Sequence, residues 1–510
     1  METLTIVPGC LGLAELRKIW AGEIRLELAE DARGAVDRAR GVIERAAARG
    51  AVVYGVTTGF GKLAQTRIPA DRLARLQLNL LRSHAVGVGA PLGDDIIRLA
   101  LALKANSLAR GHSGVRFALI EALLVLHNAG IFPVVPAKGS VGASGDLAPL
   151  AHMALPLIGE GLVRQAGTVR PARAVLEAAG IAPIVLEPKE AISLINGTQI
   201  STAIALAALF RAERLFASAL VAGALSVDAA RGSDTPFDAR IQTVRGQPGQ
   251  MRVAGLLRGL LHGSGIRHSH LDCGRVQDPY SLRCQPQVMG ACLDQFETAA
   301  AMLLREANAV SDNPLVFPEE DEVLSGGNFH AEPVAMAADG MALALAEIAN
   351  MSERRIALLV DAATSGLPAF LVAEPGLNSG FMMPQVTAAA LASENKILAH
   401  PASVDTIPTS ANQEDHVSMA THGARRLLEM IENSAGVVAI ELLAAAQGVE
   451  LLRPLQSSAR LERALASVRE GSAFLDQDRA LSPEIERTRS LVLSATMLEL
   501  TGGVIFGLVG

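Results

Sequence analysis

Four long stretches of the sequence carry the apolar spacing of buried helix faces, and they constrain the fold more than any other feature. These stretches cover residues 202–230, 295–309, 331–363 and 416–452. Their apolar residues recur every three or four positions, which is the period of a helix. Strand signals are few beyond residue 111. The sequence therefore predicts an all-α protein built on a large central bundle of long helices.

The first 111 residues are organised differently. They combine short helical patterns with a glycine-punctuated loop, Tyr54-Gly55-Val56-Thr57-Thr58-Gly59-Phe60-Gly61. Glycines at this density give a segment that can close over a pocket, although a plain surface turn is the simpler interpretation. We therefore expect a smaller mixed N-terminal region at 1–111, with the loop as its lid, and a helical core domain at 112–510.

Composition indicates how such a bundle packs. Hydrophobic residues make up 50% of the chain but aromatic residues only 3%, so small and aliphatic side chains must fill the interior. Close helix packing is the expected result. Apolar surface that remains on the helices is expected to be buried in an oligomer.

Two apolar stretches approach the length of a membrane span. Residues 200–222 contain Arg211, Glu213 and Arg214, while residues 491–509 contain Glu499 and are interrupted by glycines. Charges at such positions are costly in a bilayer, so the first stretch is better interpreted as a bundle helix. The sequence predicts no membrane partner.

Charge and cysteine usage narrow the class of function. The net charge is −7, and no basic stripe is present that would indicate a nucleic acid partner. The four cysteines form no CxxC pair, a pattern that fits a reducing compartment better than a disulfide scaffold. With no secretory signal in residues 1–12, we expect a cytoplasmic protein that acts on a small molecule.

One segment can become an electrophile: Lys138-Gly139-Ser140-Val141-Gly142-Ala143-Ser144-Gly145-Asp146-Leu147. Attack of the Gly145 nitrogen on the Ala143 carbonyl closes a five-membered ring, and loss of two waters turns the Ser144 β-carbon into an exposed methylidene. Gly145 suits this step because it lacks a Cβ. The simpler interpretation is a loop in which Ser144 or Asp146 caps a helix that begins near Leu147. Both can hold together, since a helix start there would make the methylidene a better electron acceptor.

This run, followed by Ala148-Pro149-Leu150-Ala151-His152-Met153, resembles the signature of the aromatic amino acid ammonia-lyases. Matching motifs extend in the family's order from Tyr54 to Met419 and are most similar to the histidine-specific branch. The resemblance implies a 4-methylidene-imidazole-5-one group formed autocatalytically from Ala143, Ser144 and Gly145, with no metal required. It also implies a homotetramer with shared active sites. The expected reaction is elimination of ammonia from L-histidine to give trans-urocanate.

The chain has only two tyrosines, and both lie in motifs of that family. Tyr54 matches the loop tyrosine that removes a β-proton. Tyr280 matches the second active-site tyrosine, which assists in positioning or proton transfer. Packing with a buried hydroxyl is the alternative for each. The second motif reads Gln277-Asp278-Pro279-Tyr280-Ser281-Leu282-Arg283-Cys284.

Four residues are expected to hold the substrate or the ring. Arg283 follows Tyr280 by three residues, so on a helix both could face one pocket, where a guanidinium fork binds a carboxylate. An exposed ion pair is the alternative. Asn196, in Leu194-Ile195-Asn196-Gly197-Thr198-Gln199, is similar to the asparagine that helps hold the substrate and the ring oxygens. Phe329 resembles the aromatic residue packed against the ring, and Gln277 is expected among the substrate-binding residues.

Substrate choice is expected to rest on His84, Glu414 and Met382. Ser83-His84 is typical of the histidine-specific branch, whereas branches that prefer tyrosine or phenylalanine carry His-Leu or Phe-Leu there. His84 can exchange a hydrogen bond with an imidazole, and the Glu414 carboxylate can accept an imidazole N–H. A structural histidine is the alternative for the first, and an acid capping the helix after His416 is the alternative for the second. Met382 resembles a pocket-lining position.

Other functions stay open at this stage. Thr57 stands where the histidine branch commonly has Asn, and Met383-Pro384 differs from a frequent Ile-Ala; both bear on substrate choice. A tyrosine or phenylalanine ammonia-lyase, or a 2,3-aminomutase, is the nearer alternative. A non-catalytic scaffold protein is the more distant one.

One further segment carries residues of the types that bind metals. His268, His270, Asp272 and Cys273 are ligand-type residues within a short segment. A zinc site normally places its ligands on one helix face or adds a distant fourth, and no such partner is identifiable. We expect no metal.

Overall fold

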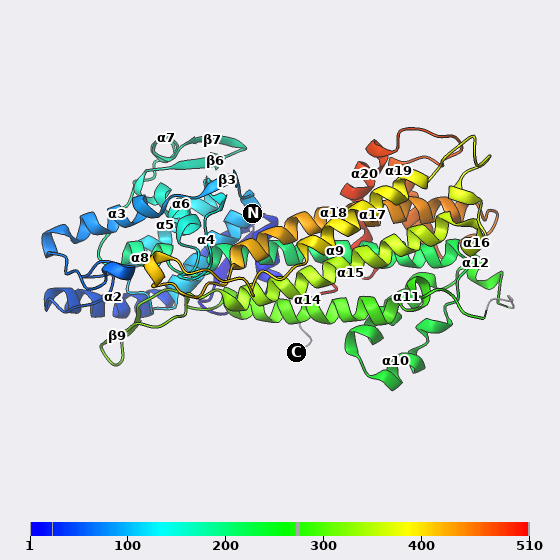
Figure 1. Ribbon diagram of the computed structural model, residues 1–510. Coiled ribbons are helices and arrows are strands. Elements are labelled where there is room, and N and C mark those ends of the chain that lie inside the picture. The colour runs from blue at the N-terminus through cyan, green and yellow to red at the C-terminus, as the bar shows by residue number, and fades with distance from the viewer. Residues whose placement is uncertain (1, 23, 272–275, 508–510) are drawn as a thin grey trace. The chain divides into compact units, whose positions relative to one another are not determined.

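The computed structural model describes residues 2–22, 24–271 and 276–507 (Figure 1). The chain forms two compact units. The first unit comprises Met1–Ala207, Ala300–Ala338 and Pro401–Arg425, and the second comprises Ala208–Ala299, Asp339–His400 and Arg426–Gly510. Helices dominate both, which confirms the all-α class. The predicted division at residue 111 marks a change in sequence pattern and not the edge of a compact unit, and it stays a prediction.

The chain passes from one unit to the other within four long helices, α9 (Gln199–Ala229), α14 (Gln285–Ala307), α15 (Glu332–Val360) and α18 (Ala420–Glu450), and a fifth time between His400 and Pro401. The four predicted stretches correspond to these helices. The largest difference is the start of α14, which precedes the predicted residue 295. Pro286 lies in its first turn, where the missing N–H has no intrahelical partner to lose, so the proline begins the helix instead of breaking it.

The first unit contains all the described strands. Strand β1 (Glu2–Ile6) pairs in parallel with β2 (Ile24–Leu28). The other pairings are antiparallel: β3 (Val88–Pro91) with β5 (Pro136–Lys138), β6 (Leu162–Gln165) with β4 (Phe132–Pro133) and β7 (Thr168–Pro171), and β8 (Leu315–Phe317) with β9 (Glu322–Leu324). The shorter helices and 3-10 turns are α1 (Leu13–Ala21), α2 (Ala32–Ala48), η1 (Gly61–Leu63), η2 (Ala70–Arg72), α3 (Leu73–His84), α4 (Asp94–Ala109), α5 (Phe117–Asn128), α6 (Leu147–Ala154), η3 (Leu155–Ile158), α7 (Ala172–Ala178), α8 (Glu190–Ile195) and η6 (Ser410–Asn412).

A small hydrophobic cluster in the first unit fixes the base of the glycine loop. Val56 packs with Val42 and Ile43 of α2 and with Val316 of β8, and Val53 lies against the same cluster. These two valines flank Tyr54 in the sequence. Their burial holds the loop on α2 and β8, so the tyrosine between them has a defined starting point.

The second unit is a helical bundle. Ala349 of α15, Ala388 of α17 and Val437 of α18 belong to one buried cluster. A buried ion pair joins two of the helices: Arg355 Nε lies 2.5 Å from Glu441 Oε1, which also accepts the Ser226 hydroxyl at 2.7 Å. The predicted bundle of long helices is confirmed here. The other elements are η4 (Thr235–Phe237), α10 (Ala239–Arg245), α11 (Pro248–Leu261), α12 (Gly265–His268), α13 (Tyr280–Arg283), α16 (Ala362–Ser365), η5 (Ala369–Leu371), α17 (Met382–Leu398), α19 (Ala459–Gly471), α20 (Ser482–Val492) and α21 (Thr496–Leu500).

Within the described residues, one helix has the length and hydropathy of a membrane span. This helix is α15, and 72% of its apolar window is buried inside the molecule, as in the core helix of a globular protein. The apolar tail at residues 491–507 is divided between the end of α20, the short α21 and an irregular segment.

A buried carboxyl in the second unit makes stability depend on pH. Asp228 Oδ2 accepts the hydroxyls of Ser264 at 2.8 Å and Ser457 at 2.5 Å. Burial raises the pKa of Asp228 from 3.8 to about 6, although the two serines and nearby His270 and Arg267 lower it. Its contribution to stability is therefore full below pH 4 and lost as pH rises through about 6.

We expect Asp228→Asn to flatten this dependence. The wild type should lose about 3 kcal/mol of unfolding free energy through this group between pH 4 and pH 7, and the variant should not. Denaturant titrations across that range measure the difference, with exposed Asp405→Asn as the control. Equal slopes in wild type and Asp228→Asn would contradict the expectation.

Candidate functional site

The predicted electrophile segment forms a tight turn in the first unit. Gly142 and Gly145 both adopt left-handed backbone, with φ of +69° and +74°. Ser144 lies between them and is partly exposed, while Ala143 is buried. A Cβ on Gly145 would lie 2.2 Å from the carbonyl oxygen of Gly197. No larger residue fits at position 145, because both the backbone angle and the contact exclude a side chain.

Four helices begin around this turn. Helix α6 starts at Leu147, directly after it. The first turn of α9 approaches through Ser201, whose backbone N–H donates to Asp146 Oδ2 at 2.7 Å. Just before α15, Ala331 N–H donates to the Gly142 carbonyl at 3.1 Å, and just before α18, Met419 N–H donates to the Val141 carbonyl at 2.8 Å. Helix N-termini carry partial positive charge, so the turn lies where negative charge is favoured.

Asp146 does not cap α6, contrary to the simpler interpretation of this segment. It occupies the N-cap position, but its side chain makes no capping hydrogen bond there. Oδ2 instead accepts from Ser201, and Oδ1 accepts the hydroxyls of Thr421 at 2.7 Å and Ser140 at 3.1 Å. Burial raises the pKa of Asp146, and these hydrogen bonds oppose that rise. The Ser144 side chain does not cap α6 either, because its hydroxyl donates to Glu414.

Ser144 bonds two of the predicted site residues. Its hydroxyl donates to Glu414 Oε1 at 2.6 Å, and its carbonyl oxygen accepts from Asn196 Nδ2 at 2.7 Å. Helix α18 begins at Ala420, well after Glu414, so this acid is not the helix cap that was the alternative. The structure thus brings Ser144, Asn196 and Glu414 together from three separate segments.

Glu414 is held as a carboxylate. Partial burial alone would raise the pKa of Glu414, but hydrogen bonds from Ser144, Thr409 and Ser410 and the charge of His84 bring it below its usual value. The Thr409 hydroxyl donates to Oε2 at 2.6 Å. A negative group at the Ser144 hydroxyl can therefore accept an N–H or bind a cationic ring near neutral pH.

His84 is the last residue of helix α3, and one of its ring nitrogens bonds the backbone of that helix. Nδ1 lies 2.9 Å from the Leu80 carbonyl, and because a carbonyl only accepts, Nδ1 carries the proton and Nε2 is left as an acceptor. Burial lowers the pKa of His84, with opposing contributions from that bond and from Glu414. The His84 ring and the Glu414 carboxylate are close enough to shift each other's pKa.

Tyr54 lies on a loop that neighbours the Glu414 segment. Its hydroxyl accepts the Gly61 N–H at 3.0 Å, and its ring meets Phe60 edge-on at 6.2 Å between centroids. The adjoining turn η1 lies beside η6, which precedes Glu414. Thr57, the departure from the histidine branch, closes the base of this loop by donating to the Ala51 carbonyl at 2.6 Å. The loop's expected movement as a lid stays a prediction.

Phe329 belongs to the segment just before α15. It is partly exposed, and the next residue, His330, stacks its ring on His416 with centroids 5.5 Å apart. His416 follows Glu414 by two residues. The segments of Phe329 and Glu414 are therefore neighbours, as the predicted site requires.

Gln277, Tyr280, Arg283 and Met382 lie in the second unit. Arg283 places its guanidinium carbon 4.6 Å from the centre of the Tyr280 ring, and Tyr280 itself is 71% exposed. The structure thus brings Tyr280 and Arg283 together on α13, as their spacing predicted. Gln277 is exposed just before them, and Met382 is exposed at the start of α17. Ser144 lies in the first unit, so a site shared with these four residues stays a prediction.

Sequence reasoning missed Lys104. Its ammonium, fully buried in α4, donates to the carbonyls of Ser193 at 3.0 Å and Asn196 at 2.8 Å, and burial lowers the pKa of Lys104 to about 7. It therefore fixes the backbone of the asparagine that bonds Ser144. A lysine inside the apolar run Leu99-Ala100-Leu101-Ala102-Leu103-Lys104-Ala105 was the signal that could have revealed it.

The described residues contain no group of three or more histidine, cysteine or acidic side chains able to hold a metal. Of the rival metal residues, Asp272 and Cys273 lie outside the described part of the chain. His268 and His270 each direct Nδ1 to a backbone carbonyl, at 2.6 and 2.8 Å.

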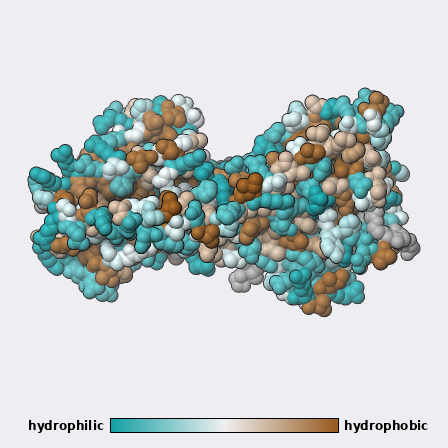
Figure 2. Space-filling model, viewed as in Figure 1, coloured by the Kyte–Doolittle hydropathy of each residue, from teal (hydrophilic) through white to brown (hydrophobic). Residues whose placement is uncertain are grey.

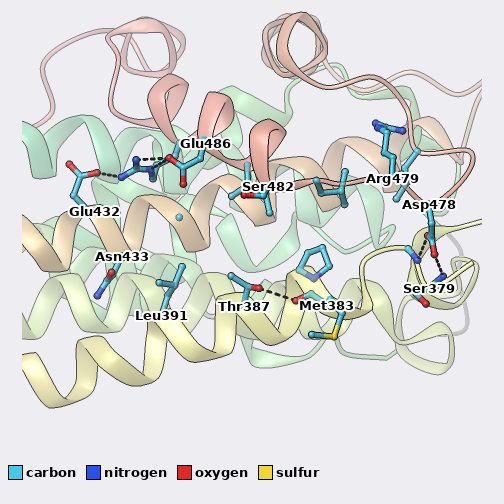
Figure 3. A pocket seen from close by; sticks show the side chains of 17 residues that line it. Ser379, Met383, Thr387, Leu391, Glu432, Asn433, Asp478, Arg479, Ser482 and Glu486 are labelled. Carbon is cyan, nitrogen blue, oxygen red and sulfur yellow. Dashed lines mark hydrogen bonds and ion pairs between the residues drawn. The ribbon is translucent and has the colours of Figure 1, made fainter.

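A cavity of about 780 Å³ in the second unit carries none of this chemistry (Figure 3). Its charged lining groups are already paired: Arg489 bonds Glu432 and Glu486, and Asp478 accepts the backbone N–H groups of Ser379 and Gly380. The cavity contains none of the predicted site residues. We therefore place the candidate site at Ser144.

Known proteins resemble the chain over nearly its whole length. The model of the family described as aromatic amino acid lyase matches residues 11–470. Histidine ammonia-lyase of Paracidovorax citrulli is 60% identical over 489 residues, 96% of each chain. That of Aromatoleum aromaticum is 62% identical over 95% of this chain and 92% of its own.

Solved structures also resemble the chain over nearly its whole length. Histidine ammonia-lyase from Trypanosoma cruzi superposes with a TM-score of 0.90 at 42% identity, covering 98% of this chain and 94% of that one. Tyrosine aminomutase from Streptomyces globisporus reaches a TM-score of 0.92 at 34% identity over 98% of both chains.

Proposed function

Because the chain belongs to the aromatic amino acid lyase family, we propose that it eliminates ammonia from L-histidine to give trans-urocanate. One observation carries this proposal: Ser144, on a turn between two left-handed glycines, bonds both Asn196 and Glu414. His84 adds an imidazole acceptor that interacts with the same carboxylate. No observation favours tyrosine or phenylalanine as the substrate.

We propose that Ala143, Ser144 and Gly145 close into a 4-methylidene-imidazole-5-one group. The residues fit it, since Gly145 has no room for a Cβ and Asn196 already holds the Ser144 carbonyl oxygen. Such a group supplies an electrophilic carbon to which an amine can add, which makes that amine a better leaving group. Asn196 and the surrounding helix N-termini would stabilise negative charge there.

The other residues would bind the substrate and move its proton. Tyr54 would take the β-proton, and Tyr280 would assist in positioning or proton transfer. Arg283, with Asn196, would hold the carboxylate through paired hydrogen bonds. Gln277, Phe329 and Met382 would complete the binding pocket.

His84 and Glu414 would recognise the imidazole ring. His84 Nε2 can accept the ring N–H, and the Glu414 carboxylate can accept another or balance a protonated ring. Apolar side chains at these positions could not satisfy those nitrogens, so the pair would separate histidine from phenylalanine.

We therefore expect His84→Leu to weaken histidine turnover selectively. Loss of one buried hydrogen-bond partner should lower kcat/KM for histidine about 10- to 100-fold, mainly through KM. Kinetics on histidine and phenylalanine measure the change, with exposed His262→Ala as the control. An unchanged kcat/KM ratio between the two substrates would contradict the assigned role.

We also propose a homotetramer with active sites shared between subunits. Supporting this, α15 and α17 expose large apolar side chains in the second unit, including Leu343, Met383, Val386 and Ile397. Apolar groups are visible among polar ones on the face shown in Figure 2. Exposed apolar surface of this kind is buried by association. Light scattering on the purified protein tests the subunit number.

We also propose that the protein is cytoplasmic. Cys10, Cys284 and Cys292 are free thiols, a state that a reducing compartment maintains.

Assays with histidine, tyrosine and phenylalanine side by side, with identification of the products, test the function most directly. We expect urocanate and ammonia from histidine and far slower turnover of the other two. A β-amino acid product, or faster release of ammonia from tyrosine or phenylalanine, would replace this proposal with the alternative activities.

A further inference from the structure

Two histidines that have no role in the proposed reaction stack on each other in the first unit. The rings of His330 and His416 are nearly parallel, 7° apart, with centroids separated by 5.5 Å. His330 Nε2 also lies 3.3 Å from the His416 carbonyl oxygen, so it can donate a hydrogen bond across the pair. The separation is within the range of favourable aromatic pairs.

The pair joins two segments that carry proposed site residues. Phe329 directly precedes His330, and Glu414 precedes His416 by two residues. Neither segment is part of a helix or of a longer strand at these positions, and Glu414 forms an isolated antiparallel bridge with Thr409. A few isolated backbone hydrogen bonds hold each segment, such as His330 N–H to the Gly327 carbonyl at 3.0 Å, and the stacked rings add a side-chain contact between the two segments.

Both segments continue from the pair to the same atom. Ala331 N–H and the Ser418 hydroxyl donate to the Gly142 carbonyl oxygen, at 3.1 and 3.0 Å. A carbonyl oxygen has two lone pairs and can accept both. His330 thus directly precedes one of the two donors that anchor the turn at Ser144, and His416 lies two residues before the other.

We propose that His330 and His416 are positioning residues that hold Phe329 and Glu414 against the Ser144 turn. The inference rests on the proposed function, because it assigns the pair to that active site. In the described part of the chain, no hydrogen bond joins either ring to the Ser144 hydroxyl or to the Glu414 carboxylate. Their effect passes through the two segments that they join.

The test compares truncation with ring-preserving substitution. His330→Ala and His416→Ala should each lower kcat on histidine about 10- to 100-fold, since a small displacement of groups around a reacting centre has effects of that size. His416→Phe keeps a ring to stack on and should recover most of the loss. The double alanine variant should have the same kcat as the less active single variant, because each single substitution already removes the stacking contact between the two rings.

Two further measurements separate positioning from folding. Intact mass gives the fraction of sites that have lost two waters, and kcat is expressed per such site. Thermal unfolding shows whether the fold persists, and His262→Ala, an exposed histidine at the end of α11, is the control for substitution itself. We expect a lower kcat per site at an unchanged unfolding midpoint.

The outcomes distinguish this inference from the function it rests on. If the wild type does not deaminate histidine, the proposed function fails. If the wild type is active and the alanine variants keep its kcat per site, or if they lose activity only in step with unfolding, the positioning role of the histidine pair is wrong while the function stands.

Discussion

Ser144→Ala is expected to abolish deamination of histidine while leaving the protein folded. Alanine lacks the hydroxyl that must leave for the methylidene to form. Substrate positioning and proton transfer would remain. However, the amino group of the substrate would stay a poor leaving group and its β-proton would stay weakly acidic. Loss of the group that carries covalent catalysis should cost more than loss of one acid–base group, which is worth about 10²- to 10⁴-fold. We therefore expect kcat to fall by at least about 10³-fold.

Steady-state kinetics, circular dichroism and intact mass on the same sample give the result. The variant should keep the wild-type helix content and the mass of its unmodified chain. Ser490→Ala, which removes an exposed hydroxyl on α20, is the matched control and should retain both activity and the loss of water. A Ser144→Ala protein that turned over histidine at the wild-type rate would rule out an electrophile built at this residue.

Tyr54→Phe is expected to produce the second-largest loss, by a different cause. The phenol is the proposed base, and the substitution removes only its oxygen, which in the structure accepts the Gly61 N–H. We expect kcat to fall about 10²- to 10⁴-fold. The mass should still be two waters lower than the translated chain, because Tyr54 takes no part in closing the ring.

A control on the same loop separates chemistry from geometry. Thr57→Val breaks the hydrogen bond to the Ala51 carbonyl that closes the loop base, but it keeps the phenol. It should cost much less activity than Tyr54→Phe. Equal losses in the two variants would assign the effect to loop geometry and remove Tyr54 from the role of base.

Helix existence could be predicted from the sequence more accurately than helix ends. The apolar period located α9, α14, α15 and α18 because their faces are buried along most of their length. The predicted start at His416 was wrong for α18, which begins at Ala420. Met419 has a φ of +56°, so the residues before Ala420 leave the helical path to reach the Ser144 turn. That change is set by a distant segment and is invisible in a local pattern.

In the candidate site, too, the residues could be predicted from local sequence but their distant contacts could not. Short motifs predicted Ser144, Asn196 and Glu414 as site residues, and in the structure Ser144 is hydrogen-bonded to the other two. The simpler interpretation of the segment had Ser144 or Asp146 cap the helix that follows, yet the Asp146 carboxylate bonds the first turn of α9. Its partner is remote in the sequence, so only the folded chain reveals it. Lys104 was missed for the same reason, since its acceptors are backbone carbonyls of α8 and Asn196, which carry no sequence signal.

The proposed reaction depends on the conversion of three consecutive residues of the chain into the reactive group. Peptide mass spectrometry on a preparation with measured histidine lyase activity tests it directly. The fragment that spans Ala143, Ser144 and Gly145 should be lighter than its sequence by two waters, in proportion to activity. Recovery of that fragment at its full translated mass from fully active protein would contradict the account.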